Sequence, residues 1–372
     1  MRLLSLEIRD FRNLAAVSLL PSPRATVLVG ANGQGKTNLL EAVYFLTTLK
    51  ALRLGRLQDL VRFDAEKAEV AGDLEGPGGL RRAAVRVASG ARTALLDGKP
   101  QESFDDYFEG LAAVAFTPDD LLLVKAGPEG RRRFLDRAAF NRWPAVLAEA
   151  REFLRALRAR NAALRHGGPE VEESFRLPLA RAGARLLVRR RALIEELAPR
   201  VRAAFQEISG PAAPEARLDY RPASGMRLEG SEAELAARLA DLLGARLAHD
   251  RERGYTTAGP QADDAVLSLD GRGARLFGSQ GQQRALVLAL KIAEIENLRA
   301  SLSRPPLLLL DDVSSELDPA KNGFLLGYLR GLDGQSFLTT TDARLLAAAA
   351  GKESAFFRVE RGAVFPLSTL VS

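Results

Sequence analysis

The sequence predicts an α/β fold interrupted by an inserted, mainly helical lobe, and three features of the chain support this. A short apolar run at residues 25–29 has the composition of a buried strand and leads into a glycine-rich loop and a helical pattern. A second apolar run, at residues 307–310, is followed by two aspartates. Between these runs, residues 131–208 are rich in Leu, Ala, Arg and Glu and show helical periodicity.

The parts of this fold follow in order along the chain. Residues 3–9 alternate apolar and polar side chains like a half-buried strand, and residues 68–100 contain strand-like stretches separated by turns, which indicate an antiparallel sheet beside the core. The 372 residues are enough for two domains. We predict that residues 1–118 and 254–372 form the α/β domain and that residues 119–253 form the helical lobe.

Composition narrows the possible function classes. The absence of cysteine excludes disulfide frameworks and Cys-based zinc sites, and two histidines leave little scope for His-metal chemistry. No apolar run has the length of a signal peptide core or a membrane span, so we expect a cytoplasmic protein without a membrane partner. Residues 131–202 contain 18 Arg and Lys against 8 Asp and Glu, a local excess that suits a polyanionic partner.

Residues 30–37, Gly-Ala-Asn-Gly-Gln-Gly-Lys-Thr, fit the phosphate-loop pattern G-x-x-x-x-G-K-[ST] between a strand and a helix. Glycines let backbone N–H groups turn toward phosphates, and the start of the following helix adds partial positive charge. We expect Lys36 to reach the β- and γ-phosphates and the Thr37 hydroxyl to bind Mg²⁺. The predicted ATP-binding residues are Gly30, Ala31, Asn32, Gly33, Gln34, Gly35, Lys36 and Thr37.

The apolar strand at residues 307–310 supplies the predicted second half of the site, because it ends in Asp311 and Asp312. A strand buried on both faces brings these carboxylates to the carboxyl edge of the sheet, beside the phosphate loop. We predict that Asp311 holds Mg²⁺ together with Thr37. Asp312 is the candidate group that orients the attacking water or accepts its proton, and it forms the predicted catalytic pair with Lys36.

Residues 279–284, Ser-Gln-Gly-Gln-Gln-Arg, precede a predicted helix at residues 285–300. A Ser and a Gly at a helix N-terminus can form an anion site, although the same pattern is commonly only a helix cap. Because the chain already has a phosphate loop, a second anion site requires a second ligand. The alternative is the same ligand presented by another copy of the chain.

Together these motifs resemble the ATP-binding-cassette group in kind and order. Ser279, Gln280, Gly281 and Gln282 lie where its signature belongs, and residues 314–318 resemble its D-loop, with Ser315 and Asp318 as site candidates. In that group two heads enclose two ATP molecules, and the signature of one chain contacts the γ-phosphate held by the other. The resemblance implies an ABC-type P-loop ATPase head, ATP and Mg²⁺ as cofactors, and a homodimer formed with ATP.

The resemblance narrows to the RecF family and covers nearly the whole chain. The similar segments are RDFRN at 9–13, FTPDDL at 116–121, GPEGRRRFLD at 127–136, RNAAL at 160–164 and GPQADD at 259–264.

Two of the family's positions differ here. The last of these segments usually reads GPHRDD, so Gln261 and Ala262 replace a basic pair, which argues against a basic, DNA-touching role there. Related ATPases have a switch histidine near residues 339–342, TTTD in this chain, so the candidate γ-phosphate sensors are Thr341 and Asp342.

Membership of the RecF family implies an ATP-dependent DNA-binding protein of recombinational repair and replication-fork maintenance. ATP would drive dimerisation on gapped DNA or at junctions of single and double strands, and slow, DNA-stimulated hydrolysis would release the protein. The implied partners are double-stranded and single-stranded DNA and a RecR-type mediator that helps to load recombinase. The implied location is the nucleoid within the cytoplasm.

The helical lobe contains the candidate DNA contacts. Arg151, Arg155 and Arg158 fall on one helix face, and Arg181, Arg185 and Arg189 repeat this spacing. For any single Arg, a solvated helix face is the more usual interpretation. For the whole stretch, the local charge excess and the family resemblance favour DNA, with Arg151, Arg155 and Arg158 as the predicted contacts.

Three other functions also use a phosphate loop. The main alternative is the nucleotide-binding subunit of an ABC transporter, against which stand the basic helical lobe and the strand-rich start. A chromosome-tethering protein of the SMC or zinc-hook type requires hundreds of heptad residues between phosphate loop and signature, and the insert here is short. A small-molecule kinase would need neither the signature nor the D-loop.

Overall fold

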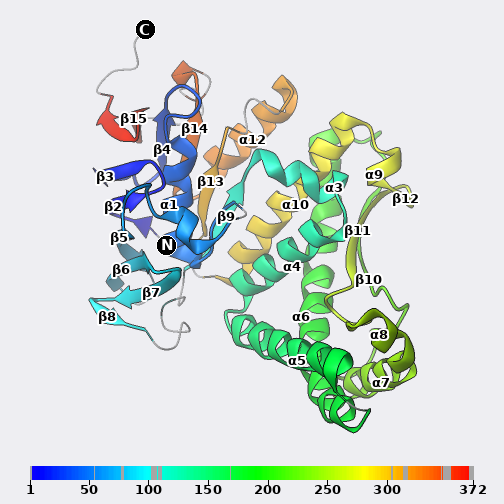
Figure 1. Ribbon diagram of the computed structural model, residues 1–372. Helices are drawn as coiled ribbons and strands as arrows, with labels where there is room; N and C mark the ends of the chain where they lie inside the picture. The colour runs from blue at the N-terminus through cyan, green and yellow to red at the C-terminus, as the bar shows by residue number, and fades with distance from the viewer. Residues whose placement is uncertain are drawn as a thin grey trace. The chain divides into compact units, whose positions relative to one another are not determined.

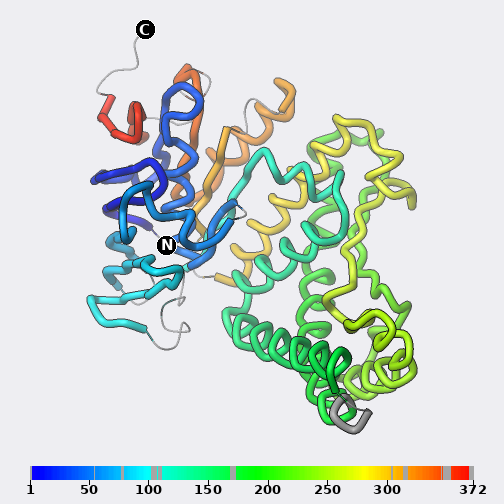
Figure 2. Tube along the Cα trace, viewed as in Figure 1, coloured from blue at the N-terminus to red at the C-terminus, as the bar shows by residue number. Residues whose placement is uncertain are grey.

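The computed structural model describes residues 2–53, 55–76, 79–101, 107, 111–167, 169–302, 305–312, 317–344, 346 and 353–367. The chain forms two compact units, and the fold is of the predicted α/β class. Unit 1 consists of Met1–Asp120 and Leu298–Ser372, and unit 2 consists of Leu121–Asn297. In Figure 2 the blue to cyan N-terminal segment and the orange to red C-terminal segment lie together in unit 1. The two ends of the chain therefore build one unit.

The six-stranded sheet of unit 1 is parallel except for one edge strand. Its order is β16 (Ala363–Pro366), β15 (Ser354–Glu360), β4 (Ala25–Val29), β14 (Ser336–Thr340), β13 (Leu307–Leu310) and β9 (Ala113–Phe116). Strands β4, β9 and β13 are almost entirely apolar and buried, as expected for parallel strands covered on both faces. Because β14 pairs with both β4 and β13, the carboxyl ends of these three strands meet at one edge (Figure 1).

The second sheet of unit 1 is antiparallel, as the alternating pattern of the N-terminal part predicts. Residues of β2 alternate between buried and more exposed positions, which is typical of a strand with one face toward the core. The strands are β1 (Arg2–Leu3), β2 (Leu6–Phe11), β3 (Leu14–Leu19), β5 (Lys67–Gly76), β6 (Gly79–Ala88), β7 (Ala91–Leu96) and β8 (Lys99–Pro100).

Helix α1 (Lys36–Thr48) holds the two sheets together. It contacts β2, β5 and β6 of the antiparallel sheet and β9, β13 and β14 of the parallel sheet. Eleven of its 13 residues are buried, which explains why this helix is apolar on all sides rather than amphipathic. The start of α1 is therefore fixed by packing before any ligand binds. The remaining helical elements of unit 1 are η1 (Leu57–Leu60), η2 (Pro118–Leu121) and α12 (Pro319–Gly331).

Unit 2 is built around the long helix α6 (Pro169–Ser209), which packs against α4, α5, α7 and β10. Helix α5 ends at His166, and α6 begins at Pro169. No helix in the described part of the chain is long and apolar enough to span a membrane. The other helices are α3 (Leu122–Lys125), α4 (Pro128–Arg142), α5 (Val146–His166), α7 (Glu232–Ala245), α8 (Leu247–Arg253), α9 (Ala274–Phe277) and α10 (Gln280–Ser301).

A small antiparallel sheet extends unit 2 beyond the predicted helical lobe. Strand β11 (Asp264–Leu269) pairs with β10 (Ala216–Arg221) and with β12 (Arg272–Gly273). This pairing places residues 254–297 with unit 2 by contact, whereas the sequence assigns them to the α/β domain. The functional division into 1–118 plus 254–372 and 119–253 stays a prediction.

Candidate functional site: a phosphate loop and two carboxylates

The glycine-rich loop connects the carboxyl end of β4 to the start of α1 in unit 1. Gly33 and Gly35 have φ angles of 79° and 115°, a region that other residues rarely adopt. A Cβ at Gly35 would lie 2.8 Å from Asn13 Oδ1, and one at Gly30 would overlap the carbonyl oxygen of Val359. Backbone angle therefore requires glycine at positions 33 and 35, and lack of space requires it at positions 30 and 35.

The side chain of Lys36 is buried at the base of this loop, with a residue exposure of 6%. Its Nζ donates hydrogen bonds to the carbonyl oxygens of Gly30 at 2.7 Å and Ala31 at 3.0 Å. Burial lowers the pKa of Lys36, and the nearby carboxylates of Asp312 and Asp311 partly oppose this. The ammonium group is thus held inside the loop by the loop's own carbonyls.

Asp311, at the end of β13, receives two hydroxyl groups. Thr37 Oγ1, at the start of α1, lies 2.9 Å from both carboxylate oxygens of Asp311. Thr339 Oγ1, on β14, donates to Asp311 Oδ1 at 2.9 Å. Burial raises the pKa of Asp311, and the hydrogen bonds from Thr37 and Thr339 partly oppose this. The two residues predicted to bind magnesium, Thr37 and Asp311, are therefore adjacent in space.

Asp312 follows in a left-handed backbone conformation, with a φ of 48°. Its N–H donates to Thr339 Oγ1 at 2.8 Å. Its carboxylate is close enough to Lys36 to raise the pKa of that lysine against the effect of burial. A non-glycine residue in this region of φ and ψ stores strain, and such strain concentrates at functional sites. The predicted catalytic residues, Asp312 and Lys36, thus both lie at the carboxyl edge of the parallel sheet.

The donor set of this edge suits a hard divalent cation that also binds phosphates. In the described residues no group of three or more His, Cys, Asp or Glu side chains is arranged to hold a metal by itself. Magnesium in nucleotide sites is usually held by one or two protein oxygens, with phosphate oxygens and water completing its coordination. Thr37 and Asp311 bring two protein oxygen donors of this kind together, and their binding of magnesium stays a prediction.

Two turns far away in the sequence support the phosphate loop, and sequence reasoning did not identify their contacts. Asn13 Oδ1 accepts from Asn38 Nδ2 at 2.7 Å. The Gln34 carbonyl accepts from the Gly362 N–H at 2.9 Å, and the Gln34 side chain accepts from the Arg361 N–H at 2.7 Å. The loop is therefore fixed on its outer side by contacts with residues distant in the sequence, which leave almost no signal in a local motif.

Glu41, a buried carboxylate on α1, was also not identified in the sequence analysis. Glu41 is fully buried and pairs with Arg12 at 3.0 Å and Arg53 at 2.7 Å. The hydrogen bonds from Arg12 and Arg53 keep the pKa of Glu41 below its usual value although burial opposes them. A signal for this cluster exists, because a single Glu in the apolar run LLEAVYFL needs a cationic partner once the helix is buried.

The predicted signature lies in unit 2 at the N-terminus of α10, where Ser279, Gln280 and Gly281 are exposed. Ser279 Oγ accepts from the Gln282 N–H at 3.3 Å, and Gln282 Oε1 accepts from the Ser279 N–H at 2.8 Å. This reciprocal pair is a capping box, so the helix cap considered in the sequence analysis is present. Binding of the same turn to a γ-phosphate held by a second copy of the chain stays a prediction.

Gln283, the next residue, fixes the turn that precedes the signature. Its side chain is buried, and its Nε2 lies 3.1–3.2 Å from the carbonyl oxygens of Ala274, Arg275 and Gly278. The α9–α10 turn is therefore anchored from below while Ser279 faces outward. A second Gln in the run GQQR gave no sequence signal for this role.

The predicted D-loop is only partly described. Ser315 lies outside the described residues, which include no residue from 313 to 316. Asp318 is the N-cap of α12, accepting from the Lys321 N–H at 3.0 Å and pairing with the Lys321 side chain. These bonds lower the pKa of Asp318, the side-chain bond from Lys321 contributing most. A role of Asp318 in a nucleotide site stays a prediction.

The two candidate γ-phosphate sensors follow β14. Thr341 is exposed. Asp342 Oδ1 accepts from the Arg344 N–H at 2.9 Å, and this bond is the main reason that the pKa of Asp342 is lowered. Both residues follow the strand that carries Thr339, and their sensing role is untested.

The arginines of unit 2 fall into two groups, and the first is a stripe on α5. The predicted DNA contacts, Arg151, Arg155 and Arg158, are all exposed. Arg165, two helical turns after Arg158, is also exposed and lies on the same face. Exposed guanidinium groups at helical spacing can follow a phosphate backbone.

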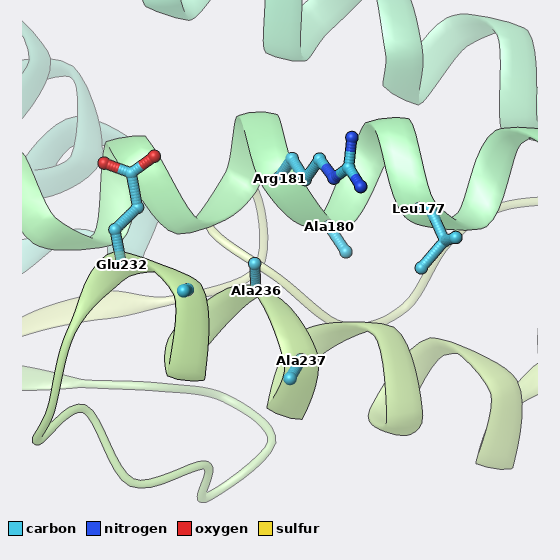
Figure 3. Close-up of a pocket in the computed structure, with 7 residues that line it drawn as sticks. Leu177, Ala180, Arg181, Glu232, Ala236 and Ala237 are labelled. Atoms are coloured by element: carbon cyan, nitrogen blue, oxygen red, sulfur yellow. The ribbon is translucent and has the colours of Figure 1, made fainter.

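The second group forms ion pairs within unit 2, apart from Arg181, which is exposed. Arg181 lines a pocket between α6 and α7, shown in Figure 3, with Glu232 on the facing helix. Arg185 and Arg189 pair with carboxylates of α5, and Arg190 and Arg131 also form ion pairs within unit 2. The ion pairs are Arg185–Glu152, Arg189–Glu149, Arg190–Asp136 and Arg131–Asp264.

The pocket in Figure 3 is the cavity between α6 and α7, with a volume of about 540 Å³. Its wall is mainly Leu and Ala, with one cation and one carboxylate. Its one cation, Arg181, therefore shares the wall with a carboxylate, Glu232. Its lining residues are Leu177, Ala180, Arg181, Glu232, Ala233, Ala236 and Ala237.

The segment at residues 259–264 is also internal. Gln261 Nε2 donates to the carbonyl oxygens of Thr256 at 3.2 Å and Ala258 at 2.9 Å. Asp263 accepts from the Tyr220 hydroxyl at 2.9 Å, and burial raises its pKa. The segment closes a loop within unit 2, which agrees with the loss of its basic pair.

Comparison with known proteins agrees with this geometry. Residues 2–363 match the family described as the RecF/RecN/SMC N terminal domain. The chain is 74% identical over 370 residues to the DNA replication and repair protein RecF of Anaeromyxobacter dehalogenans (strain 2CP-1), covering 99% of this chain and all of the relative.

Solved structures give the same assignment. A structure of the recombination mediator protein RecF-ATP in the RecFOR pathway superposes with a TM-score of 0.89 at 28% identity, covering 98% of this chain and 99% of the other. The Smc head domain of Pyrococcus furiosus, bound to part of ScpA, shares the fold with a TM-score of 0.56 at 17% identity, covering 98% and 95% of the two chains. The chain therefore belongs to the RecF family of DNA replication and repair proteins.

Proposed function

We propose that this protein is an ATP-dependent DNA-binding protein of recombinational repair and replication-fork maintenance, switched by ATP-driven dimerisation. One observation supports this most strongly. Thr37 of the phosphate loop and Asp311 of the acidic strand, 274 positions apart, are joined by hydrogen bonds of 2.9 Å. Two motifs recognised separately thus form a single site with the residue types that nucleotide hydrolysis requires.

ATP is the proposed ligand of residues 30–37. The left-handed glycines turn backbone N–H groups toward the loop interior, and the N-terminus of α1 adds partial positive charge. Lys36 would exchange its bonds to Gly30 and Ala31 for phosphate oxygens, which are stronger acceptors for an ammonium group. Binding therefore replaces internal hydrogen bonds and leaves no buried charge unpaired.

Thr37 and Asp311 are the proposed protein ligands of Mg²⁺, and their oxygen atoms already lie together. The bound ion would neutralise charge on the phosphates during transfer. Asp312 would orient the attacking water or accept its proton, while Lys36 would stabilise charge on the γ-phosphate. We expect hydrolysis to be slow and to be stimulated by DNA, because a switch needs a long-lived closed state.

The signature turn is proposed to act in a second copy of the chain. Ser279, Gln280, Gly281 and Gln282 would bind the γ-phosphate held by the partner, with Ser315 and Asp318 of the D-loop at the same interface. Exposure of the α10 N-terminus supports this proposal, because a group that serves another subunit must be accessible. The homodimer would therefore form with ATP and come apart after hydrolysis.

The α5 stripe of Arg151, Arg155 and Arg158 is the proposed DNA contact. Contacts of this kind are independent of base sequence and weaken steeply with salt. The solved RecF relative is described as a recombination mediator of the RecFOR pathway, so we propose a RecR-type mediator as a further partner and loading of recombinase at gapped DNA or strand junctions as the outcome. The matches to RecF and SMC proteins do not favour the transporter alternative.

Analytical ultracentrifugation tests the proposal directly. The protein would be sedimented with ATP, ADP or no nucleotide, each with and without gapped DNA. We expect dimers with ATP and magnesium, monomers with ADP, and co-sedimentation with DNA only in the ATP samples. A chain that remains monomeric at high concentration with a non-hydrolysable ATP analogue and magnesium would contradict the switch.

A further inference from the structure

Thr339 is buried next to Asp311 and Asp312, the two acidic residues that directly follow β13. Its exposure is 2%, and it lies on β14, which pairs with β13 on one side and β4 on the other. In this register Thr339 pairs with Leu28 and follows the Leu338–Leu310 pair, so it faces the residues directly after β13. Strands on both sides therefore fix its backbone.

One hydroxyl group of Thr339 is bonded to both acidic residues. Its Oγ1 donates to Asp311 Oδ1 at 2.9 Å and accepts from the Asp312 N–H at 2.8 Å. The group therefore uses its single proton and one lone pair on successive residues. A hydrogen bond to the carboxylate restrains its rotation, and a hydrogen bond from the N–H supports the left-handed backbone of Asp312.

We propose that Thr339 is a positioning residue that orients Asp311 toward magnesium and Asp312 toward the reacting phosphate. The proposal rests on the ATPase function argued above and adds a residue that the motifs did not include. Asp311 has a second hydroxyl donor, Thr37, but Thr37 is itself a proposed magnesium ligand. When Thr37 binds the ion, its proton turns away from the shared position, and Thr339 then supplies the remaining hydroxyl restraint on Asp311.

The same hydroxyl links the metal ligand to the group that acts on water. Asp311 is held through its carboxylate and Asp312 through its backbone, so a displacement of β14 shifts both together. Hydrogen-bond partners of this kind typically change metal affinity 10- to 100-fold when they are removed. An error of about 1 Å in the position of a catalytic group can reduce turnover about 100-fold. Both effects are expected from the loss of one hydroxyl.

The test uses Thr339→Val, which keeps the β-branched shape and removes the hydroxyl. We expect an apparent Mg²⁺ affinity in the presence of ATP that is about 10- to 100-fold weaker, read from the fluorescence of a bound ATP analogue during magnesium titration. We expect kcat at saturating magnesium to fall by a similar factor. Affinity for the nucleotide without magnesium is expected to stay within about twofold, because the phosphate loop is unchanged.

Two variants control for packing. Thr339→Ser keeps the hydroxyl and is expected to retain wild-type magnesium affinity. Thr47→Val removes another buried hydroxyl of unit 1, which donates to the Val43 and Tyr44 carbonyls within α1, and is also expected to retain it. If Thr339→Ser weakens magnesium binding as much as Thr339→Val, the methyl group and its packing are responsible, and the inference is wrong.

The result is separable from the proposed function. Wild-type magnesium affinity and kcat in Thr339→Val would overturn the inference, while a Lys36→Met variant that loses nucleotide binding would leave the ATPase function standing. If Lys36→Met binds nucleotide normally, the ATPase function itself is wrong. Thermal unfolding without nucleotide accompanies each measurement, and a change in magnesium affinity without a loss of folded protein supports positioning.

Discussion

The phosphate-loop edge of unit 1 and the signature turn of unit 2 are both candidate anion sites at helix N-termini, but they are built differently. At the phosphate-loop edge, Lys36 and Asp311 are buried, and three strands hold them in place. At the signature turn, Ser279 and Gly281 are exposed, and a capping box within α10 satisfies the turn. The phosphate-loop edge therefore holds its charged groups inside the fold, whereas the signature turn leaves its residues exposed.

In the proposed dimer, one chain supplies two halves of a site, and the two halves have different structural requirements. A buried charge needs fixed partners, so the phosphate-loop edge must be preorganised within the fold. A turn that meets another molecule needs only a stable backbone, which a cap and the anchor Gln283 supply. Variants of each half should therefore affect different steps.

Lys36→Met removes the ammonium group of the preorganised half. We expect nucleotide binding to fall by more than 100-fold and nucleotide-dependent DNA retention to be lost, because the charge-assisted bonds to the phosphates disappear. Filter binding of gapped DNA with and without ATP measures retention. Normal retention in this variant would show that the loop is not the nucleotide site. Lys67→Met, which removes an exposed lysine on β5 of unit 1, is the matched control.

Ser279→Arg places a bulky cation in the signature turn. We expect nucleotide binding by the monomer to remain within about twofold, since the change lies in unit 2, and ATP-driven dimerisation to be lost because a bulky cation replaces the small cap. Equilibrium sedimentation and nucleotide titration are performed on the same sample. If this variant forms dimers with ATP as the wild type does, the signature turn has no role in dimerisation.

Asp312→Asn separates binding from hydrolysis within the preorganised half. Loss of a general base typically reduces turnover by about 10²- to 10⁴-fold. We therefore expect slow hydrolysis, retained ATP binding and dimers that persist after ATP is added. Phosphate release and sedimentation report these properties. A variant that stays monomeric with ATP would contradict the assignment of Asp312 to the chemical step alone.

The paired substitution Arg155→Ala and Arg158→Ala should have the smallest effect. Each lost phosphate contact lowers the slope of log affinity against log salt concentration by about 0.9 on duplex DNA, so a decrease of roughly 1.8 is expected. Arg133→Ala is the control, because Arg133 is exposed and paired with Glu129. An unchanged slope in the paired variant would show that the α5 stripe is only a solvated face.

Several parts of the site were predictable because they depend on short stretches of chain. The phosphate loop is recognisable from residues 30–37, since left-handed glycines and a terminal Lys-Thr are local requirements. The apolar strand β13 with its two aspartates is also local, and the α/β fold class and the RecF family are confirmed. The metal, signature and DNA-contact assignments remain predictions that the experiments above address.

Contacts between distant residues were not predictable in the same way. The sequence cannot show that β14 lies between β4 and β13, so Thr339 was assigned no role. Nor can it distinguish the exposed Arg155 and Arg158 from Arg185, which pairs with Glu152 on a neighbouring helix. Identical residues at identical spacing differ here only in what packs against them.

The sequence by itself determined the class of fold, the family and the loop that can bind phosphate, because each follows from the order of neighbouring residues. Only the tertiary structure decided which side chains meet: Thr37 with Asp311, Thr339 with both carboxylates, and Glu41 with its two arginines. The physical reason is that backbone conformation responds to local side chains, whereas burial, pKa and hydrogen bonding depend on strand order and helix packing.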